Sequence, residues 1–323
     1  MIEPALKISD LRVNFKTMLG QVQAVRGVSL QVRPGEVLGV VGESGSGKSV
    51  SFLATMGLLP SSAQITGSAM VNGVELIGAK SSVLRAARGN EIAMIFQDPL
   101  SALNPVQRIG AQIVEMIRTH QDVSKTHALT QAVEALDMVG IPQPKERAQQ
   151  YPHEFSGGMR QRVMIAMAIA NQPKVLIADE PTTALDVTVQ AQILEVLTRI
   201  RRDLGTAIVL ITHDLGVVAR TADRVQVMYA GRVVERGAVD PIFYSTRHPY
   251  TAGLLSSLPT ASTDRLHPIP GAPPNMLEPP SGCAFRPRCQ HAIDQCAADI
   301  PELKQCGEVE TACIRAADLE WTR

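Results

Sequence analysis

A glycine-rich segment that ends in lysine and serine carries the first residues suited to chemistry. The pattern GxxxxGK(S/T) is met at every fixed position by Gly42-Glu43-Ser44-Gly45-Ser46-Gly47-Lys48-Ser49. Glycines let backbone N–H groups approach phosphate oxygens, and a following helix adds the positive end of its dipole. We expect Lys48 to neutralise charge on β- and γ-phosphates and the Ser49 hydroxyl to bind Mg²⁺. The segment therefore predicts a phosphate-binding loop.

Two carboxylates follow an apolar run at Val175–Ala178, namely Asp179 and Glu180. Ligands collect at the carboxyl ends of parallel strands, so we expect both side chains near the phosphates. Asp179 is suited to hold Mg²⁺, directly or through water. Glu180 is suited to polarise the attacking water as a general base. The alternative is a solvated acidic turn after a core strand.

Ser156, Gly157 and Gly158 open a helix-like run at Gln161–Asn171. A hydroxyl and unobstructed N–H groups at a helix N-terminus would form a second anion site, and the alternative is an ordinary helix cap. If the anion site is correct, one chain carries two phosphate-binding helix starts. One nucleotide could contact both kinds of site if the loop comes from one subunit and the Ser-Gly-Gly segment comes from a second subunit across an interface.

Elements that could position these residues alternate along the first part of the chain. Short runs rich in β-branched residues predict buried central strands at Val37–Val41, Val175–Ala178 and Ala207–Ile211. Helical spacing predicts a helix over Gln190–Leu204 that ends at Gly205. Alternating polarity predicts an antiparallel sheet from Leu6–Phe15 and Val22–Val32, and residues 108–150 read as mainly helical. The predicted fold class is α/β with an antiparallel β subdomain and a helical subdomain.

Composition and charge limit the possible functions. The 323 residues are 45% hydrophobic and 19% charged with zero formal net charge, and aromatic residues make up 3%. A nucleic-acid-binding domain usually carries positive excess and stacking aromatics, so nucleic acid is not expected as a partner. No apolar stretch reaches the ~18–20 residues that a membrane span needs.

The C-terminal part differs in composition from the rest. All five cysteines follow residue 282, after a segment with six prolines at positions 268–280. Such proline density predicts an extended connector. An odd cysteine count makes a metal site a better interpretation than a disulfide framework. We expect one domain over residues 1–258 and a cysteine-containing extension over residues 259–323.

The chain resembles the nucleotide-binding subunits of ABC transporters over about residues 5–240. The segment at Ser156–Gly158 resembles the family signature LSGGQ, with Phe155 in place of Leu and Met159 in place of Gln. The phosphate-contacting Ser-Gly-Gly is intact. The resemblance implies an ABC-type P-loop ATPase that uses ATP and Mg²⁺, with a helical subdomain at about residues 98–165.

The same resemblance implies roles for four isolated residues. Gln97 fits the Q-loop, which binds Mg²⁺ and senses the membrane subunit, and Asp186 fits the D-loop after Ala184-Leu185. His213 fits the switch histidine that contacts the γ-phosphate and joins Lys48 and Glu180 in the catalytic set. Phe15 fits the aromatic that stacks on adenine, and the alternative for it is an ordinary core residue.

Two C-terminal segments narrow the resemblance to the ATPases of the oligopeptide/dipeptide/nickel importer family. They read Arg247-His248-Pro249-Tyr250-Thr251-Ala252-Gly253-Leu254-Leu255 and Gly282-Cys283-Ala284-Phe285-Arg286-Pro287-Arg288-Cys289. This implies a peripheral subunit at the cytoplasmic face of the membrane, with two transmembrane permease subunits, a second and often non-identical ATPase subunit and a substrate-binding protein. Peptides are the expected cargo, and nickel or another small solute is the alternative.

The cysteine spacing resembles the family pattern associated with a 4Fe–4S cluster, at Cys283, Cys289, Cys296 and Cys313. Tetrahedral zinc and free thiols are the alternatives. The spacing leaves open whether Cys306 or Cys313 is the fourth ligand.

The sequence fits two other function classes less well. A soluble ABC-type ATPase acting on ribosomes or DNA usually has two nucleotide-binding domains in one chain or a long coiled-coil insertion, and the sequence has neither. A redox or metal-sensing protein would require ATPase activity that follows the oxidation state of the cysteine segment.

Overall fold

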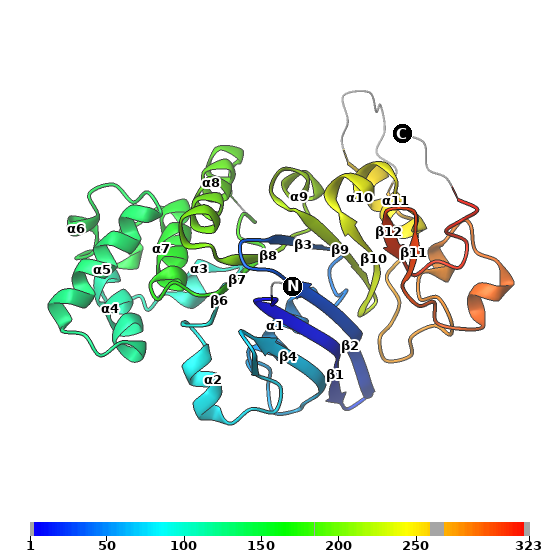
Figure 1. Cartoon of the computed structure of the whole chain (residues 1–323), viewed down its shortest axis with the longest axis horizontal. Helices are drawn as coiled ribbons and strands as arrows, with labels where there is room; N and C mark the ends of the chain where they lie inside the picture. The colour runs from blue at the N-terminus through cyan, green and yellow to red at the C-terminus, as the bar shows by residue number, and fades with distance from the viewer. Residues whose placement is uncertain (1–2, 184, 259–267, 320–323) are drawn as a thin grey trace.

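The computed structural model describes residues 3–183, 185–258 and 268–319. Two sheets form its centre, with a group of helices on one side and the C-terminal segment on the other (Figure 1). The smaller sheet is antiparallel with the strand order β2-β1-β4-β5. Its strands are β1 (Leu6–Thr17), β2 (Gly20–Val32), β4 (Ala63–Val71) and β5 (Val74–Glu75).

The larger sheet has eight strands in the order β11-β12-β10-β9-β3-β8-β7-β6. The five strands from β9 to β6 are parallel, and β10, β12 and β11 continue the sheet in antiparallel pairs. The bounds are β3 (Val37–Val41), β6 (Ile92–Ile95), β7 (Val175–Asp179), β8 (Ala207–Ile211), β9 (Arg224–Tyr229), β10 (Arg232–Ala238), β11 (Lys304–Cys306) and β12 (Val309–Thr311).

Helices flank the larger sheet and form a separate group between β6 and β7 (Figure 1). That group contains α3 (Pro99–Ala102), α4 (Ile109–His120), α5 (Lys125–Met138), α6 (Pro144–Arg147), the 3₁₀ turn η1 (Pro152–Glu154) and α7 (Gly157–Ile169). The other helical elements are α1 (Lys48–Thr55), α2 (Ser81–Ala87), α8 (Val187–Leu204), α9 (Leu215–Thr221), α10 (Val239–Tyr244), α11 (Pro249–Ser256), η2 (Arg286–Arg288) and η3 (Asp294–Ala297).

The predicted α/β fold with an antiparallel sheet and a helical group is confirmed. Every residue of the central strands β3, β7 and β8 is buried, as their apolar runs indicated. Helix α7 begins four residues before the predicted start because the Ser156 hydroxyl caps it. Helix α8 begins three residues early because Asp186 caps it, and it ends at Gly205 with φ 64° as predicted.

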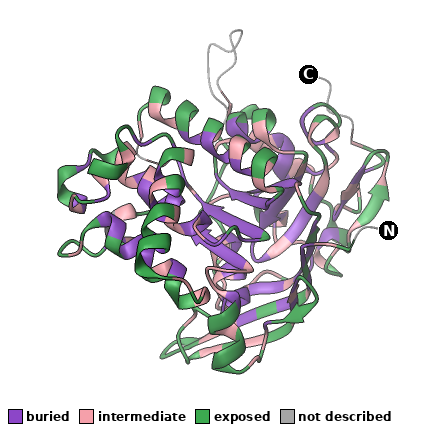
Figure 2. Cartoon of the chain, turned by 60° about the vertical axis from the view of Figure 1, so that its left-hand side comes forward, coloured by how far each residue is buried: buried purple, intermediate pink, exposed green. Residues whose placement is uncertain are grey.

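Buried side chains form three clusters that match these layers. One joins the helical group to the larger sheet, and one fills the space between the two sheets around Phe52 of α1. The third holds the C-terminal segment against β9 and β10. Figure 2 shows buried residues along the central strands and exposed residues on the outer faces of the helices. The predicted phosphate-binding loop therefore starts from a well-packed core.

The C-terminal extension adds to the main sheet and packs against it. Strand β12 pairs with β10, and an ion pair joins Arg236 to Glu310 at 2.7 Å across this pair. The rings of Tyr229, Tyr250 and Phe285 pack together, with centroids 4.5–5.3 Å apart. Positions 268–280 form neither helix nor strand, as the proline density predicted, and the first part of the connector lies outside the described residues.

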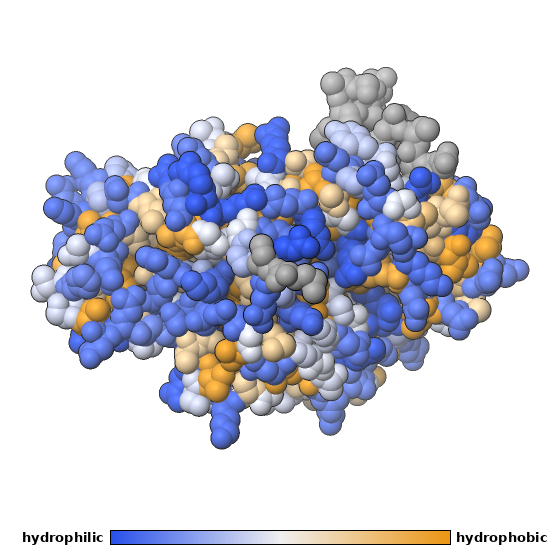
Figure 3. All heavy atoms as spheres, viewed as in Figure 1, coloured by the Kyte–Doolittle hydropathy of each residue, from blue (hydrophilic) through white to orange (hydrophobic). Residues whose placement is uncertain are grey.

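Across the described residues, no helix is both long and apolar enough to span a bilayer. Hydrophilic residues predominate on the face in Figure 3, with apolar residues in scattered groups. Exposed apolar side chains near the helical group include Phe96 and Val106.

His248 caps α11 and gives the fold a pH dependence. Its Nδ1 accepts a hydrogen bond from the Tyr250 N–H at 3.1 Å, and burial lowers its pKa from 6.5 to about 3. The unfolded chain therefore takes up this proton first, so stability present above pH 6.5 is lost as the pH falls towards 3. From pH 7 to pH 5 the loss is about 2 kcal/mol.

Denaturant unfolding of the wild type and His248→Asn at both pH values measures this contribution. Asn keeps a capping acceptor without a titrating ring, so its stability should fall by less between pH 7 and pH 5. Equal losses in the two proteins would contradict the assignment.

Candidate functional site

The loop at residues 42–49 runs from the end of β3 into α1, as the sequence predicted. Two of its glycines are required by close contacts. A Cβ at Gly42 would lie 2.1 Å from the carbonyl oxygen of Met228, and one at Gly47 would lie 2.5 Å from that of Ala24. Both residues also have positive φ, at 150° and 93°. The loop can therefore follow this path only with glycine at these positions.

Lys48 lies buried inside the loop. Its Nζ donates to the carbonyl oxygens of Gly42 at 2.7 Å and Glu43 at 2.9 Å, and reaches the Ser46 hydroxyl at 3.5 Å. Burial lowers the pKa of Lys48, while nearby carboxylates oppose the shift. The loop thus holds an ammonium group against its own acceptors, as expected for a site that receives an anion.

Ser49 and Asp179 form the next part of the site. The Ser49 hydroxyl donates to Asp179 Oδ1 at 2.8 Å, which joins the start of α1 to the end of β7. Burial raises the pKa of Asp179, the hydrogen bond from Ser49 lowers it, and the neighbouring Glu180 raises it. A hydroxyl and a carboxylate oxygen are ligands that Mg²⁺ prefers, so this pair fits a magnesium ion.

Glu180 is the centre of a cluster that joins three separate segments. Its Oε2 accepts hydrogen bonds from Gln97 Nε2 at 3.2 Å and from the Thr183 hydroxyl at 2.8 Å. Its Oε1 lies 3.3 Å from Nδ1 of His213. Gln97 follows β6 and His213 follows β8, so the strands on both sides of β7 contribute to the cluster. The structure therefore brings together Gln97, Glu180 and His213.

The backbone at Glu180 is in the left-handed region, with φ 48°. Such a conformation costs energy for a residue other than glycine and often occurs at functional sites. The Glu180 N–H donates to the carbonyl oxygen of Ile211 at 2.9 Å, and this bond holds the turn in place.

Ser156 and Asp186 each cap a helix. In the part of the chain that the structure describes, their hydrogen bonds are made within those helices and not with the loop at residues 42–49. The Ser156 hydroxyl accepts from the Met159 N–H at 3.4 Å, and Asp186 accepts from the Val189 N–H at 2.9 Å. Within the described ranges, no hydrogen bond or ion pair joins residues 156–158 to the phosphate-binding loop. Ala184 lies outside the described residues.

Phe15 is half-buried on β1. It pairs with Val22 of β2 and Ala63 of β4, and it packs on the edge of the apolar cluster between the sheets. Part of its ring is accessible, so this position leaves both interpretations open.

Sequence reasoning gave no role to three residues that contact the site. Thr183 hydrogen-bonds Glu180, and Tyr250 and Arg288 both contact Glu43 of the loop. The contacts to Glu43 span more than two hundred positions, and no local pattern encodes them. Thr183 lies only three residues after Glu180, and this short spacing was the one sequence signal that could have indicated their contact.

Four of the five cysteines line one small cavity in the extension. They are Cys283, Cys289, Cys296 and Cys313, whereas Cys306 lines a separate cavity that Cys313 also borders. All five are free thiols. Burial raises the pKa of Cys313 to about 11, and burial also raises the pKa values of Cys283 and Cys289.

Four cysteines line one cavity, and four thiolates are the usual ligand set of an iron–sulfur cluster. As the residues 3–183, 185–258 and 268–319 are arranged, however, no three His, Cys, Asp or Glu side chains are grouped closely enough to hold a metal ion. Side-chain rearrangement would therefore accompany binding.

Comparison with known families gives two matches. Residues 25–183 match the family described as "ABC transporter". Residues 234–296 match the one described as "Oligopeptide/dipeptide transporter, C-terminal region". The second match includes both segments that contact Glu43.

Similar curated proteins are about half identical to this chain over the residues that align. It is 53% identical over 319 residues to the oligopeptide transport ATP-binding protein OppD of Mycobacterium tuberculosis, covering 97% of this chain and 52% of that protein. It is 53% identical to OppD of Bacillus subtilis, covering 89% and 82%. For OppD of Escherichia coli the identity is 51%, covering 92% and 88%. The chain thus spans about half the length of the mycobacterial relative.

Solved structures share the fold. The ATP-binding cassette MJ0796, in a dimeric post-hydrolysis state bound to ADP and Pi, is 26% identical with a TM-score of 0.65, covering 72% of this chain and 98% of that one. CbiO1 from Clostridium perfringens is 29% identical with a TM-score of 0.63, covering 75% and 91%.

Proposed function

Since the chain belongs to the oligopeptide ATP-binding subunits of the ABC transporter family, we propose that it hydrolyses ATP in a membrane importer and couples this reaction to peptide uptake. One observation carries the proposal. Glu180 lies at the carboxyl end of β7, with Gln97 and His213 on either side and the Lys48 loop adjacent. This arrangement supplies a base, a cation and a metal ligand at one edge of the sheet.

The loop binds the triphosphate and orients its γ-phosphate. Lys48 exchanges its contacts with Gly42 and Glu43 for phosphate oxygens. Ser49 and Asp179 would hold Mg²⁺, and Gln97 would be a further ligand. The bound ion supplies neutralisation of charge on the β- and γ-phosphate oxygens.

Glu180 acts as the general base. Hydrogen bonds from Gln97 and Thr183 to Oε2 fix the orientation of its carboxylate group. Oε1 faces His213 and is the oxygen that accepts the proton from the attacking water. His213, which lies beside Oε1, contacts the γ-phosphate. Catalysis consists mainly of positioning and charge stabilisation.

The second half of each nucleotide site comes from a partner ATPase subunit. Ser156–Gly158 open α7 with a capped helix start, and nothing in the described part of the chain links them to the loop by a hydrogen bond or ion pair. They are therefore available to the nucleotide of a second ATPase subunit, a non-identical paralogue or a second copy. Asp186 lies at the interface between the two ATPase subunits in this arrangement. The dimer reported for MJ0796 is consistent with such pairing. Phe15 stacks on the adenine ring.

The remaining partners are two permease subunits and a substrate-binding protein. The exposed Phe96 precedes Gln97, and Val106 is 81% exposed in the loop between α3 and α4. These apolar side chains support docking of the helical subdomain, residues 98–165, on a permease at the cytoplasmic face of the membrane. The ATPase domain covers residues 1–258 and the extension residues 259–323. The names of the relatives favour peptides as cargo over nickel or another small solute.

Reconstitution tests this function. The chain, its permeases and the binding protein are placed in vesicles, and ATP hydrolysis and uptake of a labelled oligopeptide are measured. We expect peptide uptake only when ATP is present on the side of the vesicle membrane where this chain lies. ATPase activity that is stimulated by ribosomes or DNA and is unchanged by the permeases would contradict the proposed function.

We also propose that Cys283, Cys289, Cys296 and Cys313 hold a 4Fe–4S cluster, with zinc as the alternative. Their common cavity and the separate position of Cys306 support this ligand set. Cys313→Ser should lose most of its iron and acid-labile sulfide after anaerobic purification, whereas Cys306→Ser should keep both.

Elemental analysis and visible absorbance of both variants check the prediction. Stoichiometric zinc without iron in the wild type would favour the alternative. Iron that is lost in Cys306→Ser and retained in Cys313→Ser would contradict the ligand assignment.

A further inference from the structure

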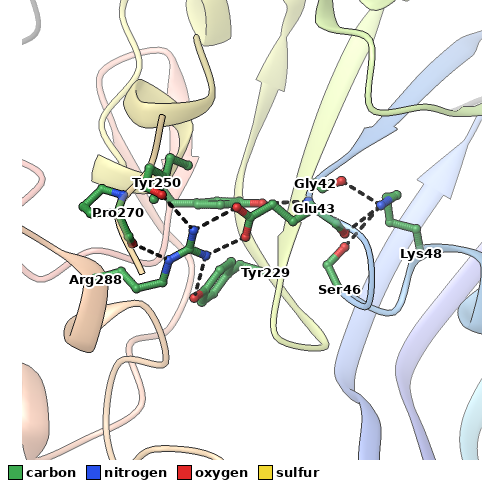
Figure 4. A network of polar contacts seen from close by, with 9 residues as sticks. Gly42, Glu43, Ser46, Lys48, Tyr229, Tyr250, Pro270 and Arg288 are labelled. Atoms are coloured by element: carbon green, nitrogen blue, oxygen red, sulfur yellow. Dashed lines mark hydrogen bonds and ion pairs between the residues drawn. The ribbon is translucent and has the colours of Figure 1, made fainter. Parts of the chain in front are cut away.

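Arg288 of the extension reaches into the phosphate-binding loop. Its Nη1 and Nη2 lie 2.6 Å and 2.9 Å from the two carboxylate oxygens of Glu43, 245 positions away in the sequence (Figure 4). The Arg288 side chain is only 5% exposed. Paired hydrogen bonds between a guanidinium and a carboxylate fix both distance and orientation.

A second contact holds the backbone of the same residue. The Glu43 N–H donates to the hydroxyl of Tyr250 at 2.8 Å, and Tyr250 is fully buried in α11. The Tyr250 ring packs against Tyr229 and Phe285. Both the side chain and the backbone of Glu43 are thus held by segments beyond β10.

Arg288 is itself fixed before it reaches Glu43. Its Nε donates to the carbonyl oxygen of Pro270 at 2.9 Å, and Nη1 lies 3.3 Å from the Tyr229 hydroxyl. Figure 4 shows the guanidinium between these acceptors and the Glu43 carboxylate. A planar fork held in this way presents a preorganised cation, which a lysine could not reproduce.

Glu43 also contacts Lys48, the residue that binds the phosphates of ATP in the proposed function. Its carbonyl oxygen accepts from Lys48 Nζ at 2.9 Å, so one residue links the extension to the loop lysine. Its carboxylate is a negative charge in a loop built for anions. Arg288 compensates this charge and keeps it oriented away from Lys48 (Figure 4).

We propose that Arg288 and Tyr250 are positioning residues of the nucleotide site, which act through Glu43 to hold the phosphate-binding loop in its ATP-binding form. The extension then forms part of this site, in addition to any metal that it carries. The inference rests on the proposed function, in which this loop binds ATP.

Steady-state ATP hydrolysis by the assembled transporter tests the inference. Arg288→Ala leaves the Glu43 charge uncompensated beside the phosphates, so KM for ATP should rise about tenfold or more, with kcat within about threefold of wild type. Glu43→Gln in the Arg288→Ala background removes that charge and should recover most of the KM. Tyr250→Phe should raise KM by about threefold through the unpaired N–H.

Arg236→Ala is the matched control. It breaks another two-pronged ion pair between the core and the extension, with Glu310, away from the loop. We expect its KM to stay near wild type. Arg288→Lys serves if the alanine variant does not fold, and should give an intermediate KM.

An unchanged KM in Arg288→Ala, an equal rise in Arg236→Ala, or no recovery in the double variant would each overturn the inference. Wild-type protein that neither binds nor hydrolyses ATP would instead refute the proposed function.

Discussion

Glu180→Gln is expected to bind ATP with near-wild-type affinity and to lose turnover by about 10²–10⁴-fold. The amide keeps the size of the side chain and can still meet Gln97, Thr183 and His213, but it cannot accept a proton from water. Binding depends on the Lys48 loop, which this change leaves in place. Calorimetry measures the affinity, and phosphate release by the assembled transporter measures turnover.

Glu195→Gln provides the matched control for this change. It makes the same chemical substitution on the exposed face of α8, where Glu195 is 75% exposed. Its turnover should equal that of the wild type. Wild-type turnover in Glu180→Gln would remove Glu180 from the base role, whatever its position at the end of β7.

Lys48→Ala should lose nucleotide affinity itself, by about 10²-fold. The ammonium is buried and already held by the loop carbonyls, so it meets the phosphates without a large cost of ordering. Removing it takes the ammonium charge out of the loop, where backbone N–H groups and Mg²⁺ would then oppose the phosphate charge together with the contact from His213. Calorimetric titration with ATP at fixed ionic strength measures the loss.

Lys125→Ala removes one positive charge from the exposed start of α5 and controls for net charge. Its affinity should match that of the wild type. Unchanged affinity in Lys48→Ala would contradict a phosphate-binding role for the loop. The two active-site variants thus separate binding from turnover.

Local sequence signals predicted most of the core. The apolar runs that became β3, β7 and β8 are buried along their whole length, and Gly205 ends α8 as its position indicated. Such signals depend on neighbouring residues, so one sequence suffices to read them. The starts of α7 and α8 were placed late because a serine and an aspartate act as caps that the apolar spacing does not include.

Long-range contacts could not be predicted in this way. The addition of β12 to β10 depends on how the whole extension folds back, and a three-residue strand carries little pattern of its own. The contacts of Arg288 and Tyr250 with Glu43 have the same origin. The spacing of the cysteines favoured Cys313 over Cys306 as the fourth member of the set without deciding between them. In the structure Cys313 lines the cavity of the other three, whereas Cys306 lines only a separate cavity that Cys313 also borders.

We propose that a partner chain completes the nucleotide site, and sedimentation of Glu180→Gln with its partner ATPase subunit tests this pairing most directly. ATP should convert single chains into pairs and ADP should not, while Ser156→Arg should prevent pairing without weakening ATP binding by the single chain. Hydrolysis at wild-type rates by a particle that sediments as one chain would contradict the account.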